Sequence, residues 1–192
     1  MRPLLLILLG GVSAFAGPFT FGVKGGVPLT DFISLTTSGF HSTTNRYIIG
    51  PTAELHLPFG LAIEVDALYR HFNYSVPGSG TTPAPGYSTT GSAWEFPLLG
   101  KYRFPGKLVR PYVDAGVAWD RLSGLTQTIK TAQVEQGGDT TTGFVIGAGL
   151  DLHVFLHFSP EFRYTRWGAH NFLDPNVSSN QNQAEFLLGI TF

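Results

Sequence analysis

The chain has 192 residues, of which 13% are charged, and its formal net charge is −1. An average soluble domain has about 25% charged residues, so this chain is poor in charge, and its balance of charges gives no electrostatic basis for binding nucleic acid. The absence of cysteine excludes disulfides, thiol catalysis, cysteine-based zinc sites and a lipoprotein anchor. The length suits a single domain.

Residues 1–16 have the pattern of a secretory signal peptide. Arg2 supplies the positive charge, residues 4–12 form a short apolar stretch, and Ala14-Phe15-Ala16 is a cleavage motif. The stretch is too short for a transmembrane helix, and no later segment reaches the ~20 apolar residues that such a helix needs. We therefore expect export by the Sec route and a mature domain over residues 17–192, which could span a membrane only with strands.

Eight segments with alternating side chains are predicted to form strands. They are residues 18–27, 46–57, 61–73, 93–104, 108–120, 141–152, 158–168 and 183–192. The connections at 58–60, 105–107 and 153–157 are short, whereas those at 28–45, 74–92, 121–140 and 169–182 are long and polar. Short and long connections alternate strictly, as in outer-membrane barrels with short periplasmic turns. The predicted fold is therefore all-β, an eight-stranded antiparallel up-and-down transmembrane barrel.

Each predicted strand has one apolar face and one face that carries charge and glycine. Nearly all strand charge, nine acids and six bases, lies on the second face. Alternation alone does not say which face is inside, so a soluble lipocalin-like carrier with an apolar interior is an alternative. Aromatic residues gather at both ends of the apolar face, as in the two interfacial girdles of membrane barrels. They are Tyr47, Tyr69, Trp94, Trp119, Phe144 and Tyr164 towards the long loops, and Phe19, Tyr102, Phe104, Phe158 and Phe192 towards the short turns.

Three stretches carry a resemblance to a known family. WEFPLLGKYRF (94–104), RPYVDAGVAW (110–119) and the closing EFLLGITF (185–192) resemble the small bacterial outer-membrane β-barrels, such as the OmpA transmembrane domain and OmpX-type barrels. The resemblance implies the bacterial outer membrane, no cofactor, and a structural, antigenic, adhesion or defence role. It also implies that Phe192 belongs to the signal that the barrel-assembly machinery reads. The expected partners are outer-membrane lipid and lipopolysaccharide, with that machinery and periplasmic chaperones during biogenesis, and we expect a monomer.

The charged face predicts a network inside the barrel. Its expected members are Glu54, Glu64, Asp66, Lys101, Arg103, Arg110, Asp114, Asp151, Glu161 and Arg163. In simple register Glu64 faces Lys101, Glu54 neighbours Glu64, and Arg103 lies beside Arg110 near the short turns. Unpaired buried charges are costly, and eight strands enclose only enough space for side chains. We therefore expect a salt-bridge plug, with a narrow ion path or gate as the alternative.

Other candidate sites are weaker. Arg121 and Arg166 follow aromatic residues near the long-loop rim and could bind lipopolysaccharide phosphates or simply extend to the surface. His153 and His157 lack further ligands at useful spacing, so we expect no metal site. A lipid A-modifying enzyme would need a triad from His170, Ser178 or Ser179, and Glu185, which does not match that family's His-x-Ser motif. We expect no catalytic residues; loss of lipid A acyl chains on expression would show otherwise.

Overall fold

The computed structural model describes residues 18–30, 33–35, 46–76, 87–129, 132–136, 140–153, 157–168 and 177–192. The predicted signal peptide lies outside these residues. The strands are β1 (Phe19–Pro28), β2 (Ile33–Leu35), β3 (Tyr47–His56), β4 (Leu61–Asp66), β5 (Leu68–Val76), β6 (Tyr87–Arg103), β7 (Val109–Ile129), β8 (Ala132–Gln136), β9 (Thr140–His153), β10 (His157–Trp167), β11 (Val177–Ser179) and β12 (Asn182–Thr191). A short 3-10 turn, η2 (Pro58–Gly60), joins β3 to β4.

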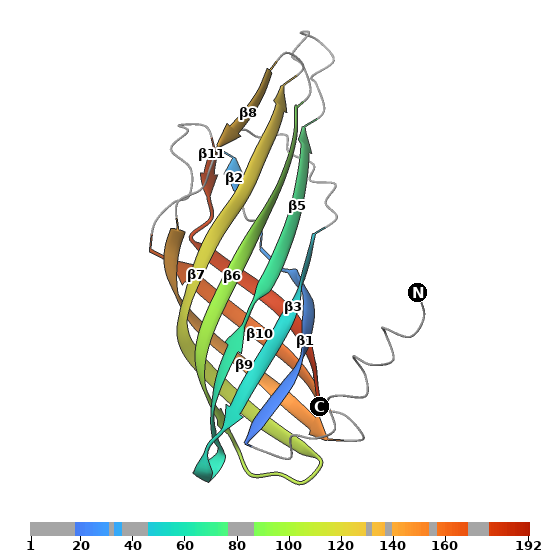
Figure 1. Cartoon of the computed structure of the whole chain (residues 1–192), viewed down its shortest axis with the longest axis vertical. Coiled ribbons are helices and arrows are strands. Elements are labelled where there is room, and N and C mark those ends of the chain that lie inside the picture. Colours follow the sequence, from blue (N-terminus) through green and yellow to red (C-terminus); the bar gives the residue numbers. More distant parts are fainter. Residues whose placement is uncertain are drawn as a thin grey trace, which may run out of the picture.

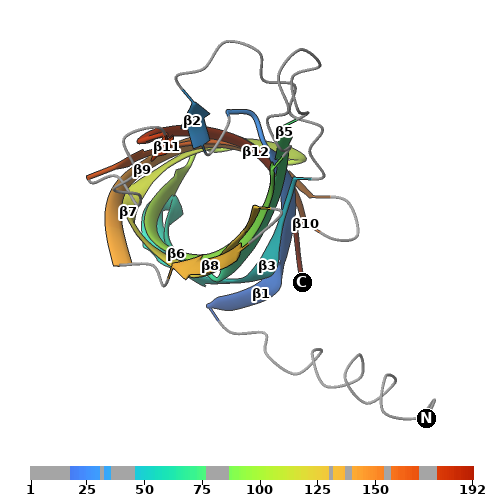
Figure 2. The ribbon, with the colours of Figure 1, turned by 90° about the horizontal axis from the view of Figure 1, so that it is seen from above.

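The strands close into an antiparallel cylinder (Figures 1 and 2). Neighbouring strands pair in chain order around the wall, and β1 pairs with β12 to complete it. β4 and β5 form one barrel strand, because both pair with β3 and β6 in unbroken register. The break between them falls at Ala67, opposite Pro51, which has no N–H to donate to the ladder. Ala67 still donates its N–H to the carbonyl oxygen of Pro51 at 3.0 Å. The predicted eight-stranded antiparallel barrel is therefore confirmed.

Two strands are longer than predicted. β6 begins at Tyr87, within the predicted loop 74–92, and β7 continues to Ile129, within the predicted loop 121–140. The added parts pair with each other, and β8 pairs with the end of β7. These strands project beyond the rest of the barrel (Figure 1). Their sequence lacks clear apolar alternation, but backbone pairing does not need it and threonine favours strands; this part of the loop prediction is wrong.

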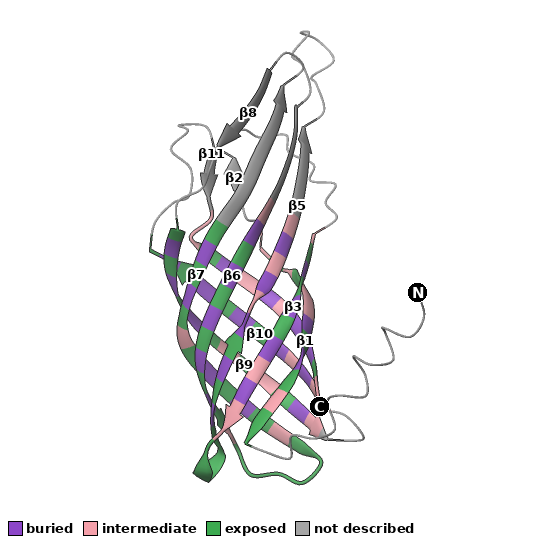
Figure 3. Ribbon diagram, viewed as in Figure 1, coloured by how far each residue is buried: buried purple, intermediate pink, exposed green. Residues whose placement is uncertain are grey.

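The apolar face of the wall points outward. Along β4, Leu61, Ile63 and Val65 are exposed, while the alternating Glu64 and Asp66 are buried. Figure 3 shows the same alternation of buried and exposed residues on the other strands. The lipocalin-like alternative required an apolar interior and is therefore wrong. No helix in the described ranges is long and apolar enough to cross a membrane.

Aromatic side chains make edge-to-face contacts on the outer face near both rims. Tyr69 and Trp94 have ring centroids 5.4 Å apart towards the long loops, and the rings of Tyr102 and Phe104 are 5.1 Å apart towards the short turns. Such rings suit the two interfaces of a bilayer, where one end of a side chain meets lipid and the other meets water. The outer surface thus has an apolar belt bounded by aromatic residues.

Candidate functional site: the charged lumen

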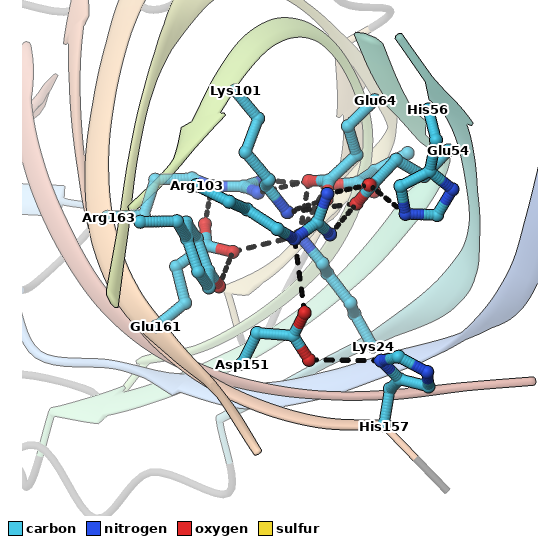
Figure 4. A network of polar contacts seen from close by, with 12 residues as sticks. Lys24, Glu54, His56, Glu64, Lys101, Arg103, Asp151, His157, Glu161 and Arg163 are labelled. Atoms are coloured by element: carbon cyan, nitrogen blue, oxygen red, sulfur yellow. Dashed lines mark hydrogen bonds and ion pairs between the residues drawn. The ribbon is translucent and has the colours of Figure 1, made fainter. Parts of the chain in front are cut away.

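The interior faces of the strands bring their charged side chains into two groups. The turn-side cluster, shown in Figure 4 with nearby partners, consists of Lys24, Glu54, Glu64, Asp66, Lys101, Arg103, Asp151, Glu161 and Arg163. The loop-side cluster consists of Arg70, Glu95, Gln183 and Glu185. The alternation that exposes the apolar residues places all of these side chains inside the cylinder.

Lys24 of β1 and Arg163 of β10 bind the same three carboxylates. Lys24 pairs with Glu64, and its Nζ lies 2.9 Å from Glu161 and 3.4 Å from Asp66. Arg163 lies 2.7 Å from Glu161, 2.9 Å from Asp66 and 3.3 Å from Glu64. Both cations are almost fully buried. Because each carboxylate meets two cations here, the loss of one cation leaves a second nearby.

Arg103 of β6 anchors the part of this cluster nearest the short turns. Its guanidinium pairs with Glu54 of β3, with the Nη2–Oε2 bond at 2.6 Å, and its Nε donates to Asp151 of β9 at 3.1 Å. His56 and His157 also contact Glu54 and Asp151, at 2.9 Å and 3.1 Å. The two pairs made by Arg103 reach past the intervening strands β4 and β7, so they join parts of the wall that share no backbone ladder.

Tyr112 of β7 belongs to the turn-side cluster although it carries no charge. Its hydroxyl donates to Glu161 at 3.0 Å, and Lys101 Nζ lies 4.3 Å from its ring centroid. Gly149 on β9 makes room for it, since a Cβ there would lie 2.5 Å from the tyrosine hydroxyl. The glycine that recurs on the charged face thus has a steric purpose at this position.

The loop-side cluster is built around one cation. Arg70 of β5 pairs with Glu95 of β6 and Glu185 of β12, and its Nη1 donates to Gln183 at 3.0 Å. Asp120 lies opposite Glu95 in the β6–β7 ladder and adds a further buried carboxylate to this level. Among the described residues of this cluster, carboxylates therefore outnumber cations.

Apolar side chains separate the two clusters. Leu68 lies between Asp66 and Arg70 along its strand, and Leu99 lies between Glu95 and Lys101. Both leucines are buried in small apolar groups, one with Ile48 and Leu187, the other with Ala118, Val145 and Trp167. The interior is thus layered along the barrel axis, with two polar clusters and apolar contacts between them.

The structure brings together eight of the ten residues predicted for the lumen. Glu54 lies opposite Glu64 as predicted, and Lys101 reaches Glu64. The register prediction was wrong, however, because Glu64 lies opposite Leu99, and Tyr112 rather than Arg110 lies opposite Arg103. Two predicted residues form no ion pair within the part of the chain that the structure describes. They are Arg110, which lies opposite Asp151, and Asp114, whose buried carboxylate oxygens lack a hydrogen-bond partner there.

Sequence reasoning missed the loop-side cluster. Arg70, Glu95 and Glu185 stand on the charged face of their strands, but no role was predicted for them in the network. The alternation of charged and apolar residues along these strands was enough to place the three side chains inside the barrel. Their meeting depends on how far the tilted strands are offset, which the side-chain pattern does not give.

The remaining candidates lie apart from the lumen or outside the described residues. Arg121 and Arg166 are exposed on the outer face, opposite Trp94 and Phe144 in their ladders. His170 lies outside the described residues, as do the side chains of His153, Ser178 and Ser179. Glu185, the acid of the considered triad, pairs with Arg70 instead.

A closed cylinder with an apolar outside and a charged inside defines an integral membrane β-barrel. The chain belongs to the family of the outer membrane protein beta-barrel domain, whose model matches residues 3–192. The resemblance to small bacterial outer-membrane barrels is thereby confirmed, and the outer membrane is its location. No curated protein matches the chain.

Two solved structures show the same fold. OprG from Pseudomonas aeruginosa superposes with a TM-score of 0.58 at 14% identity, covering 91% of this chain and 95% of that one. The Neisserial surface protein A superposes with a TM-score of 0.52 at 13% identity, covering 91% and 96%. At these identities the likeness extends to the barrel fold alone.

Proposed function

We propose that this protein has a structural or surface-interaction role in the outer membrane, and that its own ion pairs close the lumen. The observation that carries the proposal is the contact of Arg163 with Asp66. Arg163 stands on β10 and Asp66 on β4, separated along the wall by β12, β1 and β3, so the pair crosses the lumen. Arg70 and Gln183 likewise reach past β3 and β1.

Two physical arguments support a closed lumen. The interior of an eight-stranded barrel is only wide enough for side chains to fill it. Charged side chains taken out of water are stable when ion pairs and hydrogen bonds satisfy them, as for Lys24 here, which contacts Glu64, Asp66 and Glu161. The apolar groups around Leu68 and Leu99 add layers that disfavour a continuous file of water and ions. A surface role would then fall to the strands β5 to β8 that project beyond the rim.

Conductance across planar bilayers tests the closed lumen. We expect no large, steady conductance from the unmodified protein, and more frequent openings from Lys101→Ala with Arg103→Ala, which removes cations that hold Glu54 and Glu64. The matched control is Lys107→Ala with Arg166→Ala, which removes the same charge at exposed positions. A large conductance in the unmodified protein would overturn the closed lumen.

We further propose that Arg121 and Arg166 contact lipopolysaccharide phosphates. Both are exposed on the outer face beside the aromatic residues of the long-loop rim, and guanidinium groups bind phosphate in a bidentate manner. The variant Arg121→Ala with Arg166→Ala should retain less lipid A in native mass spectrometry, by roughly tenfold if each contact contributes about 0.7 kcal/mol. Lys107→Ala serves as control, and equal retention by all three proteins would contradict the contact.

A further inference from the structure

Two short turns at one end of the barrel carry the most exposed large apolar side chains of the described residues. Phe59, in the turn between β3 and β4, is 92% exposed, and Leu108, between β6 and β7, is 72% exposed. Both turns lie at the lower end of the barrel and are coloured as exposed in Figure 3. An isolated exposed apolar residue needs no explanation, but two on neighbouring turns indicate a surface that meets something other than water.

The backbone of the first turn is unusual. Phe59 has φ 65° and ψ 25°, and it is the only non-glycine residue with positive φ among those described. Glycine or asparagine adopts this left-handed conformation more readily than a residue with a bulky side chain. A phenylalanine here both strains the backbone and presents its ring, which is unfavourable in water. The environment of the ring must therefore favour it.

The first turn reaches the end of the strand that precedes the second turn. A Cβ at Gly60 would lie 2.6 Å from the carbonyl oxygen of Arg103 and 3.8 Å from the ring of Tyr102. The β3–β4 turn thus packs against the end of β6, where the second turn begins. The patch is defined here as the exposed apolar side chains of the two turns and the adjoining strand ends, which are Leu57, Phe59, Leu61, Tyr102, Phe104, Leu108 and Val109.

This patch continues the lipid-facing belt beyond the ends of the strands. Three of its members, Leu61, Tyr102 and Val109, are the belt residues nearest the turns on β4, β6 and β7. Residues 57–61 and 104–109 contain one charged side chain, Lys107. Aromatic and aliphatic side chains beside a single lysine match the interfacial layer of a phospholipid leaflet, where the rings embed and the lysine meets phosphate.

We propose that these two turns are embedded in the periplasmic leaflet, with Phe59 and Leu108 reaching the boundary between headgroups and acyl chains. The occupant of the patch is phospholipid. The lipid-contacting surface then extends through the turns on this side of the barrel and does not stop at the girdle around Tyr102. The inference goes beyond the proposed function and does not depend on whether the lumen is closed.

The absence of cysteine makes a depth measurement straightforward. Phe59→Cys, Ile63→Cys and Lys107→Cys are each labelled with a nitroxide, and the full barrel is refolded into vesicles of phosphatidylcholine and phosphatidylglycerol. Power saturation measures how often the nitroxide collides with oxygen, which is concentrated in lipid, and how often it collides with a nickel chelate, which is soluble in water. We expect the oxygen-to-nickel ratio at position 59 to be several times that at position 107 and to approach that at position 63, which lies in the belt.

A ratio at position 59 as low as that of a free nitroxide in water would overturn the proposal, because the side chain at this position would then face water although the membrane contains only lipid. Heat-modifiable migration on gels shows which labelled variants are folded. Leu108→Cys provides a second site in the same patch, so the test stands if a label at position 59 impairs folding. A ratio at position 108 as low as that of a free nitroxide in water would likewise overturn the proposal.

Discussion

The turn-side and loop-side clusters occupy the same lumen but distribute charge differently. In the turn-side cluster Glu64 contacts Lys24, Lys101 and Arg163, so its negative charge is shared among three cations. In the loop-side cluster Glu95 and Glu185 share Arg70. The comparison indicates that stability at one end depends on many partial contacts and at the other end on one residue.

The largest decrease in the free energy of unfolding is expected when Arg70 is replaced. Arg70→Met leaves Glu95 and Glu185 close together without the cation that joins them, and stranding buried charge in this way typically costs about 3–5 kcal/mol. Urea titrations of the barrel in phospholipid vesicles would measure the loss in the free energy of unfolding. Arg163→Met should cost less, because Lys24 remains beside the same carboxylates.

Arg166→Met is the matched control for both variants, since Arg166 is exposed on the outer face of the strand that carries Arg163. It should leave the urea midpoint almost unchanged. If Arg163→Met proved as destabilising as Arg70→Met, the shared contacts of the turn-side cluster would offer no protection, and the contrast between the clusters would fail.

Neutralising one carboxylate in each cluster should give effects of opposite sign. Glu64→Gln removes an anion from among three cations and should destabilise the barrel by about 2 kcal/mol, as for the loss of hydrogen bonds to charged groups. Glu95→Gln removes repulsion between carboxylates that share Arg70 and should be neutral or stabilise by about 1 kcal/mol. The same urea titrations give both values, and destabilisation of equal size would show that Glu95 is compensated as fully as Glu64.

The last prediction concerns packing within the turn-side cluster and changes no charge. In Gly149→Ala the added Cβ would lie 2.5 Å from both the Tyr112 hydroxyl and the carbonyl oxygen of Pro160, so the tyrosine or the backbone must shift and the bond from Tyr112 to Glu161 weakens. Overpacking of this kind costs about 1–3 kcal/mol. Gly100→Ala is the control, because its Cβ would point outward with its nearest neighbour at 3.7 Å. Equal stability of the two variants would show that Tyr112 and the backbone at Pro160 can move without loss.

The sequence predicts the fold well because the membrane imposes a strong pattern. The bilayer requires an apolar residue at every second position within its thickness, so strands such as β4 are recognisable from alternation alone. Beyond the bilayer that requirement ends, which is why the extensions of β6 to Tyr87 and of β7 to Ile129 were not predicted. Backbone pairing continues there without a side-chain signature.

The site is less predictable than the fold, because it depends on strand offset. The contact of Lys101 with Glu64 was predicted from a register that is wrong by two residues. It forms nevertheless, since a long lysine side chain reaches a diagonal neighbour. The meeting of Arg70 with Glu185 involves strands that are not adjacent, and no pattern within either strand contains that information.

The contacts that cross the lumen have a mechanical consequence. Backbone hydrogen bonds hold each strand to its two neighbours and so fix the circumference of the cylinder, but they resist bending of the wall only weakly. Arg163 and Asp66 join walls that are separated by β12, β1 and β3, so the cylinder cannot flatten into an ellipse without breaking ion pairs. The barrel should therefore keep a constant cross-section when the lateral pressure of the surrounding lipid changes.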